Sequence, residues 1–553
     1  MSIRLTGMAS GLDTDSMIKE LMSAYSAKKD KDVKAQTKHE WTMAAWKETN
    51  SKVYSFYTGA LSSMKFSKLG SLRKATISNS SVASITASNS APVGTHKLSV
   101  LQLATSGYMT GGEITTKSGG SVGADTKLAE LGLTSGTIKV NDTEIKINGN
   151  MTMSKLAAQM KEAGVEANFD AASGRFFVSS KASGSDGEFT ITAGDEEGID
   201  ALMSLGLMSV TDINGDETAE MAKYRELAES GLNTKEAMAA RKIVEMYDAG
   251  ELENSSESAR ISAQDALIKL NGATFTSSTN SFSINGLTIE ATAVTTKEIE
   301  NADGSVTVKD EPVTITTSVD SQGIYDKIKN FLKAYNEMIG HIDGLYYADS
   351  AKGYEPLTTE EKDALTDKEV EEWEKKVKDA LLRKDSTLGG ISSALKNVFL
   401  GMSYTTESGK TYNIATLGIG TGNYFSTDDK DRGKFHINGD KDDEATAASA
   451  DKLMAAIASD PEGVSEFFSK LADKLYSTLD DKMKSTTLSS AFTIYNDKQM
   501  SSQYSEYKKK LSDWDTKLEE IEEKYAKQFA AMEKALEQLN AKQSSLAQML
   551  GTA

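Results

Sequence analysis

The feature that most constrains this chain is a long run of regularly spaced apolar residues between positions 504 and 550. Large side chains recur there at alternating steps of three and four residues, the spacing of a helix that wraps around a partner helix. A second step of four follows Tyr525, and such an insertion locally unwinds a supercoil. Charged residues fill most other positions, so the apolar stripe is too narrow for a helix lying on a globular core. We therefore predict a coiled coil, in which these large side chains form the seam.

The length of this run supports the same interpretation. No Gly or Pro occurs between Gly463 and Gly551, so nothing in the sequence forces a break. At 1.5 Å per residue, a helix over the run would reach about 70 Å. A helix of that length needs a partner that covers its seam.

A second seam-like helix is predicted at the N-terminal end, with Asp13 or Asp15 as its N-cap. Its apolar spacing fades, returns at Trp41 and stops near Gly70. Because both ends of the chain are helical and seam-like, we expect them to pair as one helical leg. The residues that we predict to assemble this leg are Met17, Ile18, Leu21, Met22, Leu511, Trp514, Leu518, Ile521, Tyr525, Phe529, Met532, Leu536 and Leu539.

Strand patterns replace helical ones after Gly70. Residues 81–88 and 95–104 are alternating and rich in β-branched side chains, and we predict that they form the first hairpin. Two further hairpins are predicted, with turns at Asn141-Asp142 and at Ser173-Gly174. A short helix between them completes a small α/β unit.

The second half of the β region is interrupted by residues 205–258, which are charged, rich in Ala and Met, and predicted to be a helical insertion. Strands return at 269–294 and 306–319. Asp320 then begins a clear amphipathic helix, and Asp460, followed by a proline, begins the last helical region.

This order predicts an α+β multidomain fold in which the N- and C-terminal helices form a coiled-coil leg and two β-rich domains are inserted between them. The length of 553 residues suits about three to four domains. The predicted divisions are a terminal coiled-coil leg (1–40 and 500–553), a helical domain with a β-hairpin region (41–70 and 320–499), a β-rich domain with the helical insertion (71–105 and 190–319) and an outer small α/β domain (106–189).

The composition narrows the classes of partner and chemistry. Lys and Arg total 62 against 81 Asp and Glu, and the net charge of −19 disfavours nucleic acid or an anionic membrane as the main partner. No cysteine is present, which excludes disulfides, Cys-ligated zinc and thiol catalysis. No run is long and apolar enough for a membrane span, and the first residues lack the apolar centre of a secretory signal, so export would need another route.

Motifs for catalysis or cofactor binding fail on their spacing. Gly409-Lys410-Thr411 resembles the end of a phosphate loop, but Tyr404 stands where that loop needs Gly. The glycines at 418–422 do not have dinucleotide-binding spacing. Residues 212–216 resemble a calcium loop without its twelfth-position Glu; a weak cation site there or at 428–431 stays an alternative. We predict no enzyme activity and no catalytic, metal-binding or cofactor-binding residue.

Several segments resemble the flagellar filament cap family, also called hook-associated protein 2. GMASGLDTDSMIKELM at residues 7–22 is similar to the family's N-terminal region. IKNFLKAYNEMI from Ile328, SDPEGVSEFFS from Ser459 and the tail after Lys524 are similar to its C-terminal region. The block at 136–180 resembles a small module shared with flagellins. The helical insertion and the acidic stretches near positions 360 and 440 depart from the family pattern.

The resemblance implies a homo-oligomeric ring at the distal tip of the growing bacterial flagellum. Such a ring would promote the folding and insertion of exported flagellin and prevent its loss, with the terminal helices as legs. The implied partners are the chain itself, flagellin, the hook–filament junction proteins and a flagellar export chaperone at the C-terminal helix, with no nucleic acid and no membrane insertion. The implied location is extracellular, reached through the flagellar type III apparatus without a cleaved signal peptide.

A different class of function is kept as an alternative. The β domains on a helical stalk would also suit an extracellular adhesin that binds host glycan or mucin. A hydrolase hidden in the β domains is a third interpretation, but the sequence offers no nucleophile and base at useful spacing.

Overall fold

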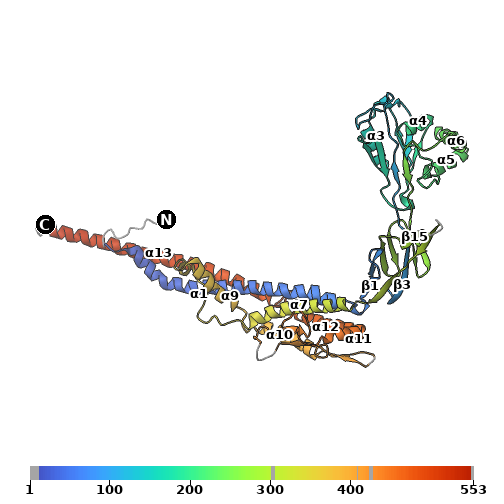
Figure 1. The fold of residues 1–553 in the computed structure, drawn as a ribbon. Coiled ribbons are helices and arrows are strands. Elements are labelled where there is room, and N and C mark those ends of the chain that lie inside the picture. Colours follow the sequence, from blue (N-terminus) through green and yellow to red (C-terminus); the bar gives the residue numbers. More distant parts are fainter. Residues whose placement is uncertain (1–10, 301–304, 408, 423–426, 550–553) are drawn as a thin grey trace. The chain divides into compact units, whose positions relative to one another are not determined.

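The chain divides into two compact units, one made of Met1–Leu72 with Asp320–Ala553 and the other of Arg73–Val319. Each unit is described by itself below (Figure 1). The residues that this computed structural model describes are 11–300, 305–407, 409–422 and 427–549.

The terminal helices of the first unit are long and lie side by side, as Figure 1 shows. Helix α1 (Thr14–Phe56) spans 43 residues, and α13 (Asp497–Met549) spans 53. The predicted N-cap of α1 is confirmed, because the Asp13 carboxylate accepts a hydrogen bond from the Ser16 N–H. The predicted pair of terminal helices, with β-rich domains between them, is therefore the observed architecture.

We call one group of packed helices the helical body. It consists of the C-terminal end of α1, which continues through a π-helical turn, η1 (Tyr57–Leu61), together with α7 (Ser321–Tyr346), α10 (Ser386–Gly401) and α12 (Pro461–Lys482). The predicted N-caps of α7 and α12 are confirmed. Shorter elements of this unit are α2 (Ser62–Lys65), η2 (Leu69–Ser71), α8 (Thr359–Asp363), α9 (Asp367–Asp379), α11 (Lys452–Ser459), β18 (Tyr404–Thr405), β19 (Thr411–Tyr412), β20 (Ile419–Thr421) and β21 (Phe435–Ile437).

The core of the helical body is rich in aromatic side chains. The rings of Tyr335 and Phe399 lie 4.4 Å apart, and Phe331 and Phe435 also contact them. Clustered aromatic rings add pairing energy to the burial of their apolar area. Other fully buried members of this core are Val53, Leu61, Ile324, Ile328, Phe467, Phe468, Leu471 and Leu475.

The second unit contains two hydrophobic cores. The first belongs to a sheet module with a five-stranded sheet in the order β1-β17-β3-β11-β12, a three-stranded sheet β13-β14-β2 and a two-stranded hairpin β15-β16. Its strands are β1 (Arg73–Ile77), β2 (Ala83–Ala87), β3 (Gly94–Gln102), β11 (Ala266–Leu270), β12 (Ala273–Ser277), β13 (Ser281–Ile284), β14 (Leu287–Ala291), β15 (Thr296–Glu300), β16 (Val306–Asp310) and β17 (Val313–Val319).

The pairing of the first two predicted strands is wrong. Residues 81–88 and 95–104 do contain β2 and β3, but β2 pairs with β14, whereas β3 lies between β17 and β11. The reason is burial, since Leu98 and Val100 of β3 are fully covered only in the middle of a sheet. The predicted hairpin rested on the closeness of the two segments and on the turn residues between Asn89 and Gly94.

The second core belongs to an α/β module. The predicted hairpins at Asn141-Asp142 and Ser173-Gly174 are confirmed as β5-β6 and β7-β8. Asn141 has a φ of 54°, which a tight turn requires and Asn tolerates. The elements of this module are β4 (Tyr108–Thr110), η3 (Leu128–Leu131), β5 (Thr137–Val140), β6 (Thr143–Lys146), α3 (Met153–Glu162), β7 (Glu166–Asp170), β8 (Arg175–Ser179), η4 (Ser185–Gly187), β9 (Ile191–Ala193), α4 (Glu196–Ser204), α5 (Ala219–Glu229), α6 (Lys235–Asp248) and β10 (Ala259–Ile261).

The helical insertion packs in the α/β module, which differs from the predicted division that groups 190–319 with 71–105. Met221 and Tyr224 of α5 and Ile243 of α6 are buried in that core. These helices present one apolar face each, and the α/β module is where the structure covers it.

A buried ionic cluster anchors the insertion. The Arg260 guanidinium is 1% exposed and contacts the Glu220 carboxylate of α5 at 3.4 Å and the Glu188 carboxylate at 2.5 Å. It also lies 4.0 Å from the centre of the Phe189 ring. Burial raises the pKa of Glu220, an effect that Arg260 opposes. The insertion is therefore tied to the module by charge as well as by apolar contact.

Candidate functional site

The candidate site is the leg, which we define as the paired parts of α1 and α13. Its centre is Asp32 of α1, whose two carboxylate oxygens accept hydrogen bonds from Lys510 Nζ at 2.7 Å and from Trp514 Nε1 at 2.8 Å. On either side, Lys29 pairs with Asp515, and His39 Nε2 lies 2.8 Å from the Met500 carbonyl oxygen. The residue numbers of the partners on α13 thus decrease as the residue numbers on α1 increase. The two helices are antiparallel.

The electrostatics of Asp32 favour its charged form. Partial burial works against the charge, but the hydrogen bonds from Lys510 and Trp514 outweigh it and lower the pKa of Asp32. At neutral pH Asp32 is a carboxylate that holds two side chains of α13 at once. A hydrogen bond from the Tyr25 side chain raises the pKa of Tyr525, so the Tyr525 hydroxyl stays neutral. The leg is therefore held by polar as well as apolar contacts.

The predicted leg residues differ in how far the structure covers them. On α13 the seam from Leu511 to Leu536 is half-buried throughout, whereas Leu539 is 60% exposed. Of the four leg residues predicted on α1, Ile18 is buried, Met22 is half-buried, and Met17 and Leu21 are exposed at 39% and 43%. The remaining half-buried members are Trp514, Leu518, Ile521, Tyr525, Phe529 and Met532.

The seam of α1 has a seven-residue register that the apolar pattern did not reveal. Its covered positions recur at Ile18, Tyr25, Asp32, His39, Trp46 and Val53. Two of these, Asp32 and His39, are polar and look like solvent-facing residues when α1 is considered alone. The missed signal was the heptad itself. Positions that lie seven residues apart, counted from Ile18 to Val53, occupy the same side of a coiled-coil helix, whether the residue is apolar or polar.

The base of the leg is closed by aromatic stacking. The rings of Trp46 and Tyr495 lie 5.4 Å apart at 8° to each other, and Tyr54 meets Phe492 edge to face. Asn50 adds hydrogen bonds to the Ile494 N–H and the Phe492 carbonyl oxygen. These contacts fix the loop before α13, so the helix leaves the body in a set direction.

Helices α8 and α9 attach to the side of α1. Lys34 of α1 forms an ion pair of 2.6 Å with Glu361 of α8, and Lys378 of α9 lies 4.4 Å from the centre of the Trp41 ring. The acidic stretch near position 360 therefore contacts the leg directly.

The far end of α13 runs beyond the start of α1. Near its own start, α1 buries Thr14 and Ile18, while α13 continues to Met549. Along this continuation Leu539 and Leu546 are exposed at 60% and 61%. Within the described residues, this last part of the α13 seam is the least covered part of the leg.

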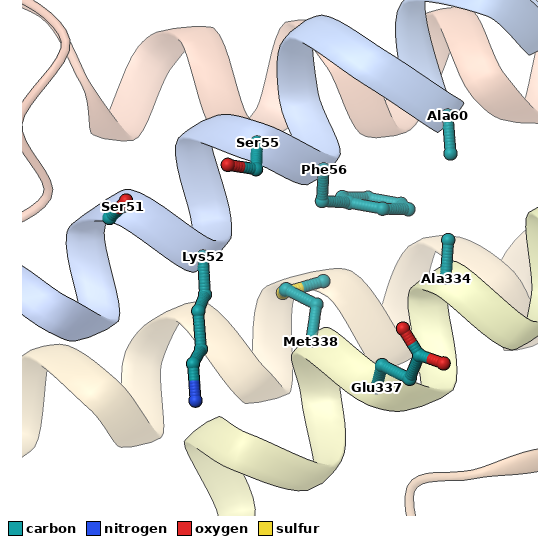
Figure 2. A pocket seen from close by; sticks show the side chains of 8 residues that line it. All are labelled: Ser51, Lys52, Ser55, Phe56, Ala60, Ala334, Glu337 and Met338. Carbon is teal, nitrogen blue, oxygen red and sulfur yellow. The ribbon is translucent and has the colours of Figure 1, made fainter.

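A pocket of about 490 Å³ lies on the helical body beside the base of the leg. Figure 2 shows Phe56 and Met338 between α1 and α7, with Lys52 extending away from them. Burial and the nearby Lys52 lower the pKa of His341, which is therefore neutral at pH 7. The side chains offer no nucleophile with a base. The lining residues are Ser51, Lys52, Ser55, Phe56, Ala60, Ala334, Glu337 and Met338.

Among the described residues, no group of three or more His, Asp or Glu is placed to hold a metal ion. The Asp212 carboxylate instead accepts the backbone N–H groups of Asn214 and Asp216, as in an ordinary polar turn. No helix in the described part of the chain has an apolar stretch long enough to span a membrane.

Comparison with protein-family models identifies the family. The model for the C-terminus of flagellar hook-associated protein 2 matches residues 263–541, and the model for its N-terminus matches residues 10–107. This chain belongs to the flagellar hook-associated protein 2 family. The two matched regions include most of α1 and α13, so the leg is part of what the family models describe.

Individual relatives of this family agree over long stretches. The flagellar hook-associated protein 2 of Halalkalibacterium halodurans is 23% identical over 603 residues, covering 100% of both chains. That of Thermotoga maritima is 26% identical over 60% of this chain and 41% of its own length. Among solved structures, the three-domain flagellar cap protein of Escherichia coli covers 79% of this chain and 96% of its own, at 19% identity and a TM-score of 0.45.

Proposed function

We propose that this chain is the cap of the bacterial flagellar filament. Copies of it form a ring at the distal tip, and the legs contact the end of the filament, where exported flagellin folds and is inserted. Membership of the hook-associated protein 2 family supports the cap role. None of the relatives reported above is an adhesin, so the comparisons give that alternative no support.

The observation that carries the role of the leg is the continuation of the α13 seam past the start of α1. Leu539 and Leu546 keep the spacing of the seam but are about 60% exposed. Apolar seams at this spacing pair with another helix. Helices of flagellin or a hook–filament junction protein in the assembled filament, and an export chaperone before assembly, are the partners that we assign to this surface.

The absence of cysteine in the sequence suits the proposed route of export. A chain without disulfides has no covalent crosslink to prevent it from passing unfolded through the flagellar type III apparatus. The leg would then pair only after export, when α1 and α13 meet.

A deletion strain tests the proposed function. Cells that lack this chain should carry bare hooks and lose monomeric flagellin to the medium, which electron microscopy and an immunoblot of the culture supernatant measure. The full-length chain supplied from a plasmid is the matched control and should restore filaments. Full-length filaments on the deletion strain would contradict the cap function.

A further inference from the structure

Two segments of the sheet module are unusual because they carry no charge. No Asp, Glu, Lys or Arg occurs between Lys74 and Lys97 or between Lys269 and Glu290, in a chain that is 26% charged. The two segments meet in the fold, since β2 from the first pairs with β14 from the second. Strand β12 also lies in the second segment.

Strand β12 is an edge strand without the usual protection. It is the last strand of the five-stranded sheet in the described residues, and its sequence ATFTS contains no charge, Pro or Gly. Edge strands are normally blunted by such residues because their free peptide groups are a template for another chain. The opposite edge, β1, carries Arg73 and Lys74. The two edges of the five-stranded sheet therefore differ, because β1 is charged and β12 is not.

The free peptide groups of this edge can be identified. Asn271 and Gly272 form a two-residue turn with φ of 51° and 86°, so the flanking pair Leu270 and Ala273 is hydrogen-bonded. Alternation along the antiparallel pair then leaves Thr274 and Thr276 with peptide groups that point away from β11. Both threonine side chains are exposed.

The hairpin β15-β16 is a second exposed feature of the same module, and it is charged at Lys297 and Glu298 of β15 and at Lys309 and Asp310 of β16. Its base is fixed, because Asp310 accepts hydrogen bonds from Ser99 Oγ at 2.6 Å and Thr295 Oγ1 at 2.7 Å. Its strands pair only with each other among the described residues, and Val306 and Val308 are 59% and 62% exposed. Two-stranded hairpins are marginally stable in water unless another element covers them.

We propose that β16 of one copy of this chain adds to the open edge of β12 of the next copy. The proposal rests on the proposed function, which requires copies to assemble. Copies that each carry a net charge of −19 repel one another, and an uncharged contact avoids adding to that repulsion. Of the two hairpin strands, β16 begins with the uncharged run Val-Thr-Val before Lys309 and Asp310, whereas β15 is charged from its second residue, Lys297, onward.

The symmetry of this contact suits a ring. Because β12 and β16 are different surfaces of the chain, their contact is head-to-tail, and repeated head-to-tail contacts form a ring when the rotation between copies closes. Pairing of β12 with a second β12 would instead stop at two copies.

Disulfide trapping tests the contact, since the chain has no cysteine of its own. Full-length chains carry Thr274→Cys or Thr276→Cys together with Val306→Cys or Val308→Cys, four combinations that allow for the unknown register. Residues opposite each other on neighbouring strands are close enough for a disulfide. After mild copper-phenanthroline oxidation, at least one combination should give a ladder of dimers, trimers and larger species on a non-reducing gel.

The controls separate this contact from other modes of association. Each single cysteine variant should stay monomeric on the gel, and so should Thr76→Cys on β1 combined with Val308→Cys. Absence of a ladder in all four combinations, or a dimer from Thr276→Cys alone, would overturn the proposal. The deletion strain tests the cap function separately. If the plasmid restores filaments but no cysteine combination gives a ladder, the proposed contact is rejected and the cap function is retained.

A second measurement uses the chain without crosslinks. Thr276→Lys places a charged side chain on β12, as natural edge strands often do. This change should raise about tenfold the concentration at which half of the chains are assembled, measured by light scattering. Thr276→Val keeps the outward peptide group and should assemble like the wild type. Equal assembly of the lysine and valine variants, with unchanged circular dichroism, would overturn the proposal.

Discussion

The helical body and the leg use the same helical periodicity but bury their apolar side chains to different extents. In the body, Phe399, Phe467 and Leu471 are fully covered because several helices surround them. In the leg, the α13 seam is half-buried against a single partner helix, and Leu539 and Leu546 are about 60% exposed. The body therefore covers its own apolar side chains, whereas the leg keeps apolar surface that a further helix can cover.

The largest expected effect is in the body. Phe399→Ala removes a fully buried ring from the aromatic cluster and should lower the free energy of unfolding by about 3–5 kcal/mol. Urea unfolding followed by tryptophan fluorescence measures this, because every tryptophan of the chain lies in the first unit. Lys474→Ala on the exposed face of α12 is the control and should change stability little. Equal effects of the two substitutions would contradict the difference drawn above. The tryptophans are Trp41, Trp46, Trp373 and Trp514.

The next effect is confined to the leg. Leu518→Asp combined with Ile521→Asp places two charges in the seam and should cost about 2–4 kcal/mol of helix pairing while the body stays folded. Trp514 fluorescence should change, and cells with this variant should lose filaments and motility. Secreted protein must be measured separately, since export of the variant can also fall.

A matched control adds the same charges outside the seam. Thr516→Asp with Gln528→Asp changes exposed positions of α13 and should leave pairing and motility near the wild-type level. Intact filaments with the seam variant would reject the leg assignment, and loss of filaments with the control would show that charge alone is responsible.

A smaller effect is expected at the polar centre of the leg. Asp32→Asn weakens the hydrogen bonds to Lys510 and Trp514 and should cost about 1–2 kcal/mol, since bonds to charged groups are worth about 1.5–3 kcal/mol and this one is partly solvated. Its contribution in the wild type should also depend on pH. The folded-state pKa of Asp32 lies below the ordinary 3.8, so the stabilisation is present above that value and is lost as the pH falls through the folded-state pKa.

Fluorescence of Trp514 between pH 7 and pH 2 follows this titration, because its indole N–H donates to Asp32. The Asp32→Asn variant should lack the step that the wild type shows below pH 4. A step of the same size in both proteins would assign it to other carboxylates.

The smallest effect on stability is expected where the leg is least covered. Leu546→Ala should change the free energy of unfolding by less than about 0.5 kcal/mol, because the side chain is already 61% exposed. Filament growth should nevertheless slow if this surface meets a partner helix. Motility in soft agar, compared with the conservative Leu546→Met variant, measures the functional part. Normal motility of Leu546→Ala would exclude Leu546 from the partner surface.

Local chemistry made much of the fold predictable. Asp13, Asp320 and Asp460 begin helices where their side chains accept backbone N–H groups, and the turn at Asn141 needs a residue that tolerates positive φ. These signals depend on a few neighbouring residues. The pairing of β2 with β14, by contrast, joins segments about two hundred residues apart. Nothing in the sequence of either strand identifies the strand with which it pairs.

The candidate site was predicted on one helix better than on the other. The α13 seam is apolar, so its spacing was visible, although burial could not be predicted without knowing where α1 begins. Asp32 and Lys29 belong to the seam only because Lys510, Trp514 and Asp515 face them. A polar seam position looks like any solvated residue until the partner helix is known.

The ionic cluster around Arg260 has a consequence for exchange of segments between relatives. Removal of the helical insertion would take Glu220 away and leave the buried guanidinium with Glu188 as its remaining carboxylate partner. Glu188 still compensates the charge, but the guanidinium loses one of its two carboxylate partners, so trimming the insertion should destabilise the α/β module. A chimera that trims the insertion should therefore be made both with Arg260 and with an apolar residue in its place, because the ionic cluster links the two in the structure.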